Sequence, residues 1–469
     1  MTESTSRKRG DLYIGVDVGG TKIQATLADL CGMVLGSERR PTPHGKGPQA
    51  VFEEIVAAIS EVLSAGSAAK NGAEPDSVRA VGLAIPGVVD PAAGRVVVTP
   101  NMELSGADAV AFLEETLGVP VALGNDCNLG TLGEEWLGAA RDADSAVGIF
   151  IGTGVGGGFV RKGKVWRGHR YAAMEIGHMV MEIDGPECGC GNRGCLEALA
   201  SRTAIEREIR CAVKAGRKTA LSKLLDGDLS SIRSGALRQA DDDDDDLVCE
   251  VLRRASRVLG YACMTLRHVL DPEVIVLGGG VIEACSAFML PIIQEVVESD
   301  RLSGAHEEVR ILVSSLDDDA VALGAVALAQ IRVGVDPFDA DTRRAYARDV
   351  YAKVTDYGFG SISVGSETYE HDIYIRVSGK VRKRKKSQAK KRYGNSHTIG
   401  PEELEKACRG GPEVLFVGTG QSGLVSMTEE ARRFLRLRSI EVLDVPTPEA
   451  AEAYNKCEQR KAALFHLTC

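Results

Sequence analysis

The sequence lacks several features that would assign it to a specialised class of protein. It has no apolar run of about 18 residues, so we expect no transmembrane helix and no membrane partner. Its first ten residues, MTESTSRKRG, are basic but no apolar signal segment follows them. It also lacks an excess of positive charge. The 56 Lys and Arg against 66 Asp and Glu give a net charge of −10, so we do not expect general nucleic-acid binding.

What is present is the composition of a soluble globular protein, with 44% hydrophobic and 26% charged residues. A chain of 469 residues exceeds one ordinary domain, and we expect two or three. Most of the 12 cysteines are scattered, and Cys263 and Cys285 lie in apolar patterns. Cysteines of this kind indicate a reducing compartment, so we expect a cytoplasmic protein.

Residues 175–197, EIGHMVMEIDGPECGCGNRGCLE, hold one histidine and three cysteines, a closed four-ligand set for Zn²⁺. Glycine accepts the positive φ that the tight Cys-x-Cys spacing requires. Disulfides are the alternative, but three clustered cysteines leave one over. The predicted ligands are His178, Cys188, Cys190 and Cys195, and the turn glycines are Gly189, Gly191 and Gly194.

A carboxylate flanks each end of this stretch. Glu175 lies three residues before His178, and Glu197 lies two residues after Cys195. A metal ion bound here would fix both carboxylates near one place, which suits a polyhydroxylated ligand. The alternative is a structural zinc knuckle with incidental glutamates.

Glycine-rich turns follow predicted strands at three places. Two have a strand–turn–strand design, in residues 11–36 and 146–166, and the third, in 274–284, leads into a helix. Backbone N–H groups in such turns can face an anion, and a helix N-terminus can receive a nucleotide. The residues are Asp17, Gly19, Gly20, Thr21 and Lys22; Gly152, Thr153, Gly154, Gly156 and Gly157; and Gly278, Gly279 and Gly280.

The second turn superficially fits a dinucleotide fingerprint, but that motif needs a helix after its glycines. The segment FVRKGKV that follows is another predicted strand, so we reject NAD binding. Two similar hairpins indicate two halves of related design that clasp one phosphate chain. For the first turn alone, an ordinary β-turn is the alternative.

Polar residues also follow strand ends. RAVGLAIPGVVD (79–90) is a predicted buried strand that ends near Gly87, and Asn101 follows the next strand. A further strand leads through Asn125 and Asp126 into a helix, a position where α/β proteins usually form their sites. The alternative is that Asp126 only caps that helix.

Helices are predicted at 48–65, over most of 201–268 and at 316–334. The acidic run from Asp241 to Asp246 precedes a long helix at 247–268. Carboxylates are favourable at a helix N-terminus because of the helix dipole, so we interpret the run as a solvated cap rather than an ion site.

The motifs DVGGTK, GNDCN, GTGVGGG, EIGH and CGCGNRGC, in this order and spacing, resemble those of the ROK family of sugar kinases and related repressors. The resemblance covers about residues 11–333. It implies an α/β fold of the actin-like, hexokinase-like type, with two ribonuclease-H-like lobes and a cleft between them. Lobe 1 would comprise residues 11 to about 125 with 317–333, and lobe 2 about residues 126–316.

The resemblance also implies functions for the matching residues. Asp126 would be the catalytic base, and the three glycine-rich turns would bind ATP and Mg²⁺, the third on the adenosine side. Two departures affect the sugar pocket: the family often has glycine where Met174 stands, and many members have an aromatic residue where Ser105 stands. The implied sugar contacts are Gly87, Asn101, Asn125, Asp126, Glu175, His178 and Glu197.

Residues 334–350 are polar and are predicted to form an exposed linker. Residues 351–469 are predicted to form a second, small α/β domain. Its basic stretch and the motifs GNSH, FVGTGQSG and AALFHLTC resemble a family of unknown biochemical function that includes a mitochondrial complex I assembly factor. We therefore expect a chain ending near Val335 to fold and to phosphorylate sugar by itself.

Within this C-terminal unit, Lys380 to Arg392 holds nine basic residues in thirteen. We interpret it as a solvated hairpin, with contact to nucleic acid or an acidic partner as the alternative. Gly418 to Gly420 is interpreted as a turn rather than an anion site. His397 and His466 are interpreted as structural.

The function that these residues favour is ATP-dependent phosphorylation of a hexose, with Asp126 taking the proton of the sugar hydroxyl. Glucose at its 6-hydroxyl is the first choice, and N-acetylmannosamine, N-acetylglucosamine and fructose are alternatives. The expected cofactors are ATP, Mg²⁺ and structural Zn²⁺. The expected assembly is a homo-oligomer, either a dimer or a tetramer.

A sugar-responsive repressor is the hypothesis from another class. A repressor needs a DNA-reading module before the sugar domain, and only about ten residues precede the first predicted strand. A third hypothesis is a scaffold in which the C-terminal unit is the active partner.

Overall fold

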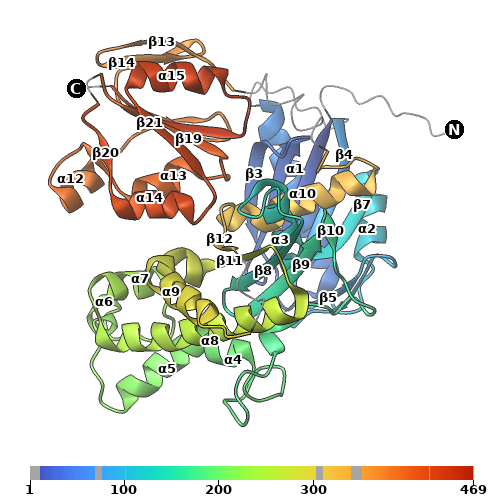
Figure 1. The fold of residues 1–469 in the computed structure, drawn as a ribbon. Helices are drawn as coiled ribbons and strands as arrows, with labels where there is room; N and C mark the ends of the chain where they lie inside the picture. Colours follow the sequence, from blue (N-terminus) through green and yellow to red (C-terminus); the bar gives the residue numbers. More distant parts are fainter. Residues whose placement is uncertain are drawn as a thin grey trace.

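The structure, a computed structural model, describes residues 11–68, 77–100, 102–302, 310–339, 351–421 and 423–467. Two sequence predictions fall outside these residues: the site residue Asn101 and the part of the linker from 340 to 350. Figure 1 shows the N-terminal part of lobe 1 in blue with the light-orange helix α10 packed against it, lobe 2 in green and yellow, and the C-terminal domain in orange and red.

Lobe 1 is built on a five-stranded sheet of order β3-β2-β1-β4-β7. Strands β3, β2 and β1 form an antiparallel meander, and β4 and β7 run parallel to β1. The elements are β1 (Leu12–Val18), β2 (Lys22–Asp29), β3 (Val34–Pro41), α1 (Gly47–Ala68), β4 (Val78–Ile85), β5 (Val88–Asp90), β6 (Arg95–Val98), α2 (Ala109–Leu117) and β7 (Val121–Asn125).

Lobe 2 has a second five-stranded sheet, of order β10-β9-β8-β11-β12. The elements are α3 (Asp126–Leu137), β8 (Ser145–Ile151), β9 (Val155–Arg161), β10 (Lys164–Val165), η2 (Ile176–His178), α4 (Leu196–Ala200), α5 (Arg202–Lys214), α6 (Leu221–Leu224), α7 (Ser234–Asp242), α8 (Asp246–Leu270), β11 (Val274–Gly278), α9 (Gly280–Glu298) and β12 (Arg310–Val313).

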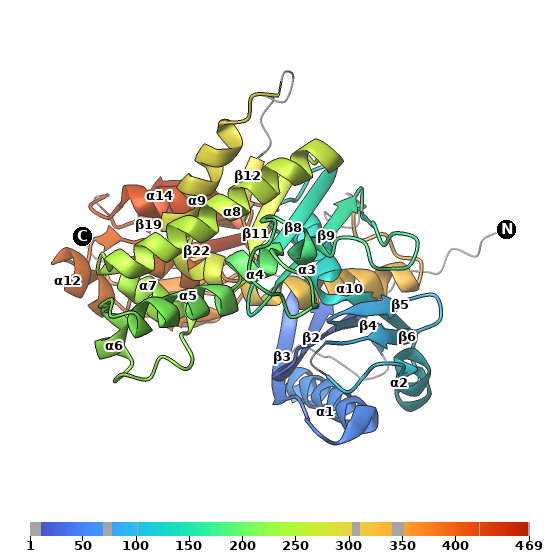
Figure 2. The same cartoon turned by 90° about the horizontal axis from the view of Figure 1, so that it is seen from below.

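The two sheets follow the same plan, since β8 and β9 pair antiparallel and β11 and β12 run parallel to β8. This confirms the prediction of two halves of related design. The chain crosses between the sheets twice, from β7 into α3 and from β12 through η3 (Asp317–Asp319) into α10 (Ala320–Arg332). Figure 2 shows α3 and α10 between the two sheets.

Glycines in the first sheet allow α10 to pack against it very closely. A Cβ atom on Gly15 would lie 2.0 Å from the carbonyl oxygen of Ala322, and one on Gly82 would lie 1.8 Å from that of Ala325. On the opposite face, α1 and α2 contribute Phe52, Ile55 and Leu113 to a separate apolar core. Helix α10 therefore completes lobe 1, although about two hundred residues separate it from β7.

One described helix, α9, is long and apolar enough to cross a membrane by length and composition alone. This corrects the expectation that the sequence holds no such segment. Val281, Met289 and Ile293 of this helix belong to the buried core of lobe 2. Buried core helices pass the same compositional test, so the helix is weak evidence for a membrane span.

Only the end of the acidic run, Asp245 and Asp246, has the predicted place at the start of α8; Asp241 and Asp242 instead end helix α7. Asp245 is the N-cap residue, and its side chain accepts a hydrogen bond of 2.9 Å from the backbone N–H of Val248. The cap satisfies one of the helix N-terminal N–H groups, which have no partner within the helix.

The C-terminal domain has a five-stranded sheet of order β17-β16-β22-β19-β21 and two smaller sheets. Helix α15 covers one face of the large sheet through Tyr454, and α13 and α14 cover the other through Leu404 and Leu435. The elements are β13 (Val354–Gly358), β14 (Ser361–Val364), β15 (Glu367–Tyr369), β16 (Ile373–Ile375), β17 (Val381–Lys383), α12 (Ser387–Tyr393), β18 (Thr398–Ile399), α13 (Pro401–Ala407), β19 (Val414–Thr419), β20 (Ser426–Met427), α14 (Glu429–Arg436), β21 (Glu441–Val445), α15 (Thr447–Lys456) and β22 (Lys461–His466).

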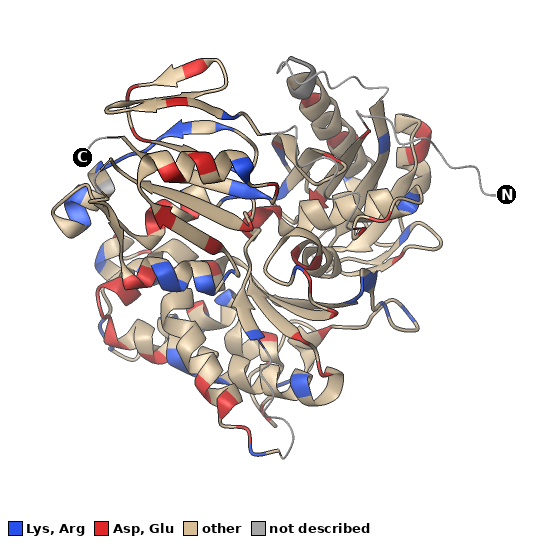
Figure 3. Cartoon of the chain, turned by 45° about the horizontal axis from the view of Figure 1, so that its top comes forward, with Lys and Arg blue, Asp and Glu red and all other residues tan. Residues whose placement is uncertain are grey.

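The interpretation of Lys380 to Arg392 as a hairpin is wrong in its second half. Residues 381–383 form β17, but Ser387–Tyr393 form helix α12, because Ala, Gln, Lys and Arg favour a helix. Figure 3 shows α12 with its basic residues at the outer edge of the domain, away from lobe 1. Arg384 is buried rather than solvated, and it bonds to Glu403 and Asp372.

The described part of the predicted linker packs against lobe 2 instead of being fully exposed. Trp136 Nε1 donates a 2.8 Å hydrogen bond to the carbonyl oxygen of Pro337. The ring of Phe338 lies 2.6 Å from the place where a Cβ atom on Gly163 would be. A buried indole N–H needs such a partner, so this contact anchors the chain after α10.

Candidate active site

Asp126 is the first residue of α3, directly after β7, as the sequence predicts. Asn125 caps the helix by accepting a hydrogen bond from the N–H of Asn128, so the capping alternative for Asp126 is wrong. Asn125 Nδ2 also donates to Asp126 Oδ1 at 2.9 Å and to the carbonyl oxygen of Gly87 at 3.0 Å. The Asp126 carboxylate is thereby held in one orientation.

The environment of Asp126 makes its carboxylate more basic than that of an exposed aspartate. Burial raises the pKa of this carboxyl, while hydrogen bonds from Cys127 and Asn125 oppose the shift. A carboxylate that is desolvated and yet fixed by hydrogen bonds is suited to accept a proton from a bound hydroxyl.

The first glycine-rich turn joins β1 to β2. The negative charge of Asp126 acts on Asp17, which stands just before this turn. Gly19 N–H donates to the carbonyl oxygen of Lys22 at 2.9 Å, and Thr42 Oγ1 donates to that of Gly19 at 2.6 Å. Burial, together with the negative charge of Asp126, raises the pKa of Asp17 to about 7. A cation beside these carboxylates would relieve that repulsion.

The second turn, at Gly152–Gly154 between β8 and β9, approaches the same place from lobe 2. A Cβ atom on Gly156 would lie 2.4 Å from Cys127 Sγ, next to Asp126. A Cβ atom on Gly154 would lie 2.2 Å from Glu197 Oε2. The turn is fixed by Arg202, whose Nη2 donates to Thr153 Oγ1 at 2.7 Å.

The third turn follows β11 and opens α9. Gly279 is the N-cap residue with φ of +86°, a conformation that favours glycine. A Cβ atom there would also lie 2.6 Å from the carbonyl oxygen of Ile151, so the turn packs directly against the end of β8. Gly278, Gly279 and Gly280 therefore lie beside the strand that carries the second turn.

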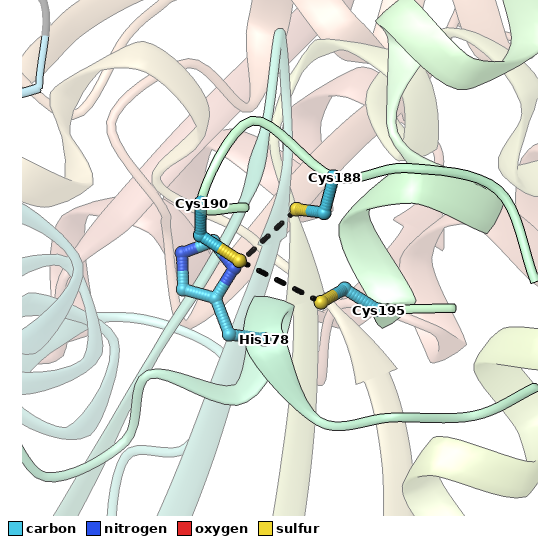
Figure 4. A group of neighbouring side chains, drawn as sticks. All are labelled: His178, Cys188, Cys190 and Cys195. Atoms are coloured by element: carbon cyan, nitrogen blue, oxygen red, sulfur yellow. Dashed lines mark hydrogen bonds between the residues drawn. The ribbon is translucent and has the colours of Figure 1, made fainter. Parts of the chain in front are cut away.

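The predicted metal ligands converge, as Figure 4 shows. One donor atom from each of His178, Cys188, Cys190 and Cys195 lies within 4.8 Å of all the others. The Cys190 and Cys195 sulfurs are 3.8 Å apart, and Cys188 Sγ lies 3.7 Å from His178 Nδ1. With Zn–S bonds of about 2.3 Å, a tetrahedral zinc site has S···S edges of about 3.8 Å. The arrangement fits a tetrahedral ion.

Two of the three turn glycines in this stretch have the predicted function. Gly191 and Gly194 adopt φ of +90° and +70°. A Cβ atom on Gly194 would lie 1.7 Å from the carbonyl oxygen of Glu182, so no other residue fits there. Gly189 has neither a positive φ nor a close neighbour, so it is not required for the turn.

The metal-ligand cluster contacts the two flanking carboxylates of the prediction. Cys188 Sγ lies 3.6 Å from Glu197 Oε1, and Glu197 Oε2 accepts a 3.1 Å hydrogen bond from Val155 N–H after the second turn. Burial raises the pKa of Glu175, with Asp126 and Glu197 adding to the shift and His178 opposing it. The charges of Asp126 and Glu197 therefore both act on Glu175.

Several residues near this site were not singled out from the sequence. A small cavity beside Asn125 is lined by Val89, Arg167 and Tyr171, among others. Asp318 Oδ2 lies 3.8 Å from Lys22 Nζ and 3.1 Å from Arg39 Nη2. The three consecutive aspartates at 317–319 are the sequence signal that could have indicated Asp318. The segment 166–173, which holds Arg167 and Tyr171, carries no comparable motif.

The two departures from the family pattern have different structural settings. Met174 adopts φ of +67°, which a non-glycine residue rarely does, so glycine would fit this backbone better. Ser105 is exposed, and its Oγ accepts a 3.0 Å hydrogen bond from Thr99 N–H.

The ROK family matches residues 13–332 of this chain. The chain belongs to the ROK family. A second family, a protein of unknown function (DUF498/DUF598), matches residues 354–466, and this ROK protein therefore carries a separate C-terminal domain after its sugar-kinase-type fold.

ROK relatives with different functions resemble this chain. The glucokinase of Thermotoga maritima is 33% identical over 324 residues, covering 68% of this chain and 98% of that protein. A ROK glucokinase from Streptomyces griseus, solved with glucose and AMPPNP, is 30% identical with a TM-score of 0.60, covering 68% of this chain and 99% of that one. The N-acetylglucosamine repressor of Escherichia coli O157:H7 is 28% identical over 317 residues, covering 68% of this chain and 75% of the repressor.

Proposed function

We propose that this ROK protein is an ATP-dependent hexose kinase that phosphorylates glucose at its 6-hydroxyl. The observation that carries the proposal is the position of Asp126, which Asn125 orients between the glycine-rich turns of the two lobes. The glucokinases among its relatives support the same reaction. Because repressors share the fold, family membership alone does not select this function.

In the proposed reaction, Asp126 accepts the proton of the sugar hydroxyl as that oxygen attacks the γ-phosphorus of ATP. The bond between the γ-phosphorus and the bridging oxygen breaks, and ADP leaves with the electron pair. Lys22 and the N–H groups of the two hairpin turns offset charge on the phosphate oxygens. Glu175, His178, Glu197 and Asn125 orient the sugar hydroxyls, with Asn101 and Gly87 completing the set.

The acidic residues near the phosphate turn fit a divalent cation. Asp17 is half-buried, and desolvation together with the nearby negative charges of Asp126 and Asp318 raises its pKa to about 7. Mg²⁺ bound there would neutralise charge on the phosphates of ATP. Asp17 is the residue of this chain that would hold the ion.

Zinc is the metal proposed for His178, Cys188, Cys190 and Cys195, because the donor set and the sulfur spacing suit a tetrahedral site. Its contribution would be structural: it holds the loop that carries Glu175 and Glu197. The scattered cysteines, such as Cys263 and Cys285 in apolar patterns, support a reducing, cytoplasmic location.

The test is ADP release by the full-length protein with ATP, Mg²⁺ and a panel of glucose, mannose, fructose, N-acetylmannosamine and N-acetylglucosamine. We expect the highest kcat/KM with glucose. Preference for another hexose would keep the kinase and overturn the sugar. Binding of a sugar, measured by calorimetry, without ADP release from any of them would favour a regulator-type ROK protein instead.

A further inference from the structure

The small cavity beside Asn125 is enclosed by residues of both lobes. The hairpin β5–β6 of lobe 1 contributes Val89 and Pro91, and the segment after β10 in lobe 2 contributes Arg167 and Tyr171. Its free volume is ≈ 10 Å³, which is at the lower limit for one water molecule. A sugar therefore cannot enter it, and what fills it must be a water molecule or a side chain of the protein.

Asn128, in the first turn of α3, lines the same cavity. The residue is only 6% exposed, and its side-chain oxygen Oδ1 has no hydrogen-bond partner within the described part of the chain. Asn125 cannot supply the donor, because its two Nδ2 hydrogens already go to the carbonyl oxygen of Gly87 and to Asp126 Oδ1. A buried acceptor without a donor is costly, so another group on the cavity wall is expected to reach it in a working state of the protein.

Arg167 is the group on that wall with the largest unused capacity to donate. Its side chain is half-buried, and its guanidinium has no hydrogen bond or ion pair among those that the described residues form. A guanidinium carries five N–H donors, and a partly desolvated charge without a partner is unfavourable. Tyr171 offers a single hydroxyl on the same wall.

The loop that carries Arg167 has a tight and strained backbone. Ala173 N–H donates a 3.3 Å hydrogen bond to the carbonyl oxygen of Arg167, and Gly168 and Met174 have φ of +71° and +67°. Strained backbone of this kind persists only where the surroundings hold it, and it is found most often at functional sites. The loop leads directly into Glu175, one of the predicted sugar contacts.

The acceptor on the other side of the cavity belongs to the turn that carries the proposed base. Asn128 N–H donates to Asn125 Oδ1 at 2.9 Å, and Asn125 in turn orients Asp126. The chain joins the two lobes at α3 and α10, so the lobe 1 hairpin can approach the lobe 2 loop. Such a closing motion presses the hairpin against the loop and moves Arg167 toward Asn128.

We propose that Arg167 is a positioning residue of the sugar site, and that its guanidinium donates to Asn128 Oδ1 when the lobes close on bound sugar. The bond fills the cavity and fixes the first turn of α3, with Asn125 and Asp126, against the sugar. This inference rests on the proposed function and adds a residue that none of the sequence motifs contains. The bond forms beside the sugar contacts rather than at the phosphate turns, so the effect is on sugar binding and not on ATP binding.

The experiment is a double-mutant cycle in the full-length protein. The cycle comprises Arg167→Ala, Asn128→Ala and the variant with both changes, and Arg167→Lys tests for partial rescue. Arg170→Ala is the matched control from the exposed part of the same loop, and Tyr171→Phe removes the other donor on the cavity wall. For each protein, the Kd of glucose is measured by calorimetry, KM and kcat by ADP release, and sugar-free stability by urea unfolding.

We expect Arg167→Ala to raise the Kd and KM of glucose about tenfold, the effect of losing one hydrogen bond from a charged donor. Asn128→Ala should have a similar effect, and the double variant should be no worse than either single variant, because both changes remove the same bond. Arg167→Lys should recover part of the loss, and Arg170→Ala and Tyr171→Phe should match wild type. KM for ATP should stay within about twofold, and sugar-free stabilities should be additive, because the bond forms only with sugar bound.

Additive losses of glucose affinity in the double variant would overturn the inference, since a water molecule would then satisfy Asn128 independently of Arg167. An effect of Tyr171→Phe as large as that of Arg167→Ala would also overturn it, because the hydroxyl would be the donor. Equal coupling in sugar-free stability would show that the bond is structural. If Asn128→Ala does not fold by circular dichroism, Asn128→Ser replaces it in the cycle.

Calorimetry separates this inference from the proposed function. Glucose binding by wild type without ADP release would overturn the kinase proposal, and the cycle in glucose Kd would still decide the inference. ADP release with additive losses would overturn the inference and keep the kinase. A wild-type protein that binds no hexose would overturn both.

Discussion

The inter-lobe site and the interior of the C-terminal domain both contain clustered charges, but the two clusters differ in how well the charges are paired. At the site, Asp17 and Asp126 are half-buried, desolvation raises the pKa of both carboxyls, and the charge of Asp126 raises that of Asp17 further. In the C-terminal domain, burial also acts on Asp372, but hydrogen bonds from His466 and Lys386 outweigh it, so its pKa is lowered.

The C-terminal cluster is satisfied within the protein. Arg384 bonds to Glu403 at 2.8 Å and to Asp372 at 3.3 Å, and Asp372 also accepts from His466 Nδ1 at 2.5 Å. Such a network needs no ligand, which agrees with the interpretation of His466 as structural. Carboxylates left without cations, by contrast, mark a place where substrates or metal ions supply the missing charge.

The sharpest test of the comparison is Asp126→Asn. The amide keeps the shape of the side chain but cannot accept a proton, so we expect kcat to fall by about 10²–10⁴ while glucose binding persists. Steady-state kinetics and calorimetry provide the two measurements. Asp144→Asn, an exposed aspartate of the same lobe, is the control. Near wild-type turnover in Asp126→Asn would remove Asp126 from its assigned role.

The second test addresses the paired cluster. Asp372→Asn leaves Arg384 and Lys386 without their shared carboxylate, and breaking a buried ion pair typically costs about 3–5 kcal/mol. We expect urea unfolding to show this loss in the C-terminal domain, with Glu452→Gln on the surface of α15 as the control. A loss no greater than that of the control would show that the network is not structural.

The same cluster has a predicted pH dependence. Because the folded pKa of Asp372 is lower than its unfolded value of about 4, its stabilising contribution is fully present above pH 4. It is lost as pH falls through the folded pKa. Below that range, the wild type and Asp372→Asn should therefore converge in stability.

The third test concerns the metal-ligand cluster, whose thiolates also depend on a cation from outside the chain. Cys190→Ser should abolish zinc binding and raise KM for glucose about tenfold or more, because the loop with Glu175 and Glu197 is released. KM for ATP should change less. Elemental analysis measures the metal, and Cys211→Ser, an exposed cysteine outside the cluster, is the control. Freshly prepared reduced wild type without zinc would contradict the assignment.

The smallest expected effect concerns backbone strain near the site. Tyr171 and Met174, which precede Glu175, both have a positive φ. Met174→Ala removes the side chain but keeps the strain, whereas Met174→Gly removes both. We expect the glycine variant to be more stable than the alanine variant by about 1 kcal/mol in urea unfolding. Equal stability would mean that the backbone at 174 relaxes in solution.

The sequence was sufficient for features that depend on local spacing. The strand–glycine–strand turns, the junction at Asn125–Asp126 and the convergence of Cys188, Cys190 and Cys195 all arise within short segments, where strand alternation and turn chemistry leave few arrangements. The related design of the two halves was also predicted from the two similar hairpins, but the strand order of the sheets was not.

The sequence was not sufficient for contacts made by long side chains between distant segments. Asp318 meets Lys22 across 296 positions, and Arg460 reaches Gly32 across 428. Neither pair has a local signal, and charged residues such as Arg438 and Arg460 are normally assigned to the surface. The same bias made the basic stretch look solvated, although Arg384 is buried.

The position of the last strand in the C-terminal sheet has a consequence for how the chain is made. Strand β22 (Lys461–His466) lies in the middle of its sheet between β16 and β19, and each of its residues is buried. The sheet therefore cannot close until residues 461–466 leave the ribosome. Lobe 1 also waits, since α10 is synthesised roughly 10–40 s after β7 at ordinary elongation rates. A premature stop directly before Lys461 would remove this central strand, and newly made chains would depend on chaperones while both sheets stay open.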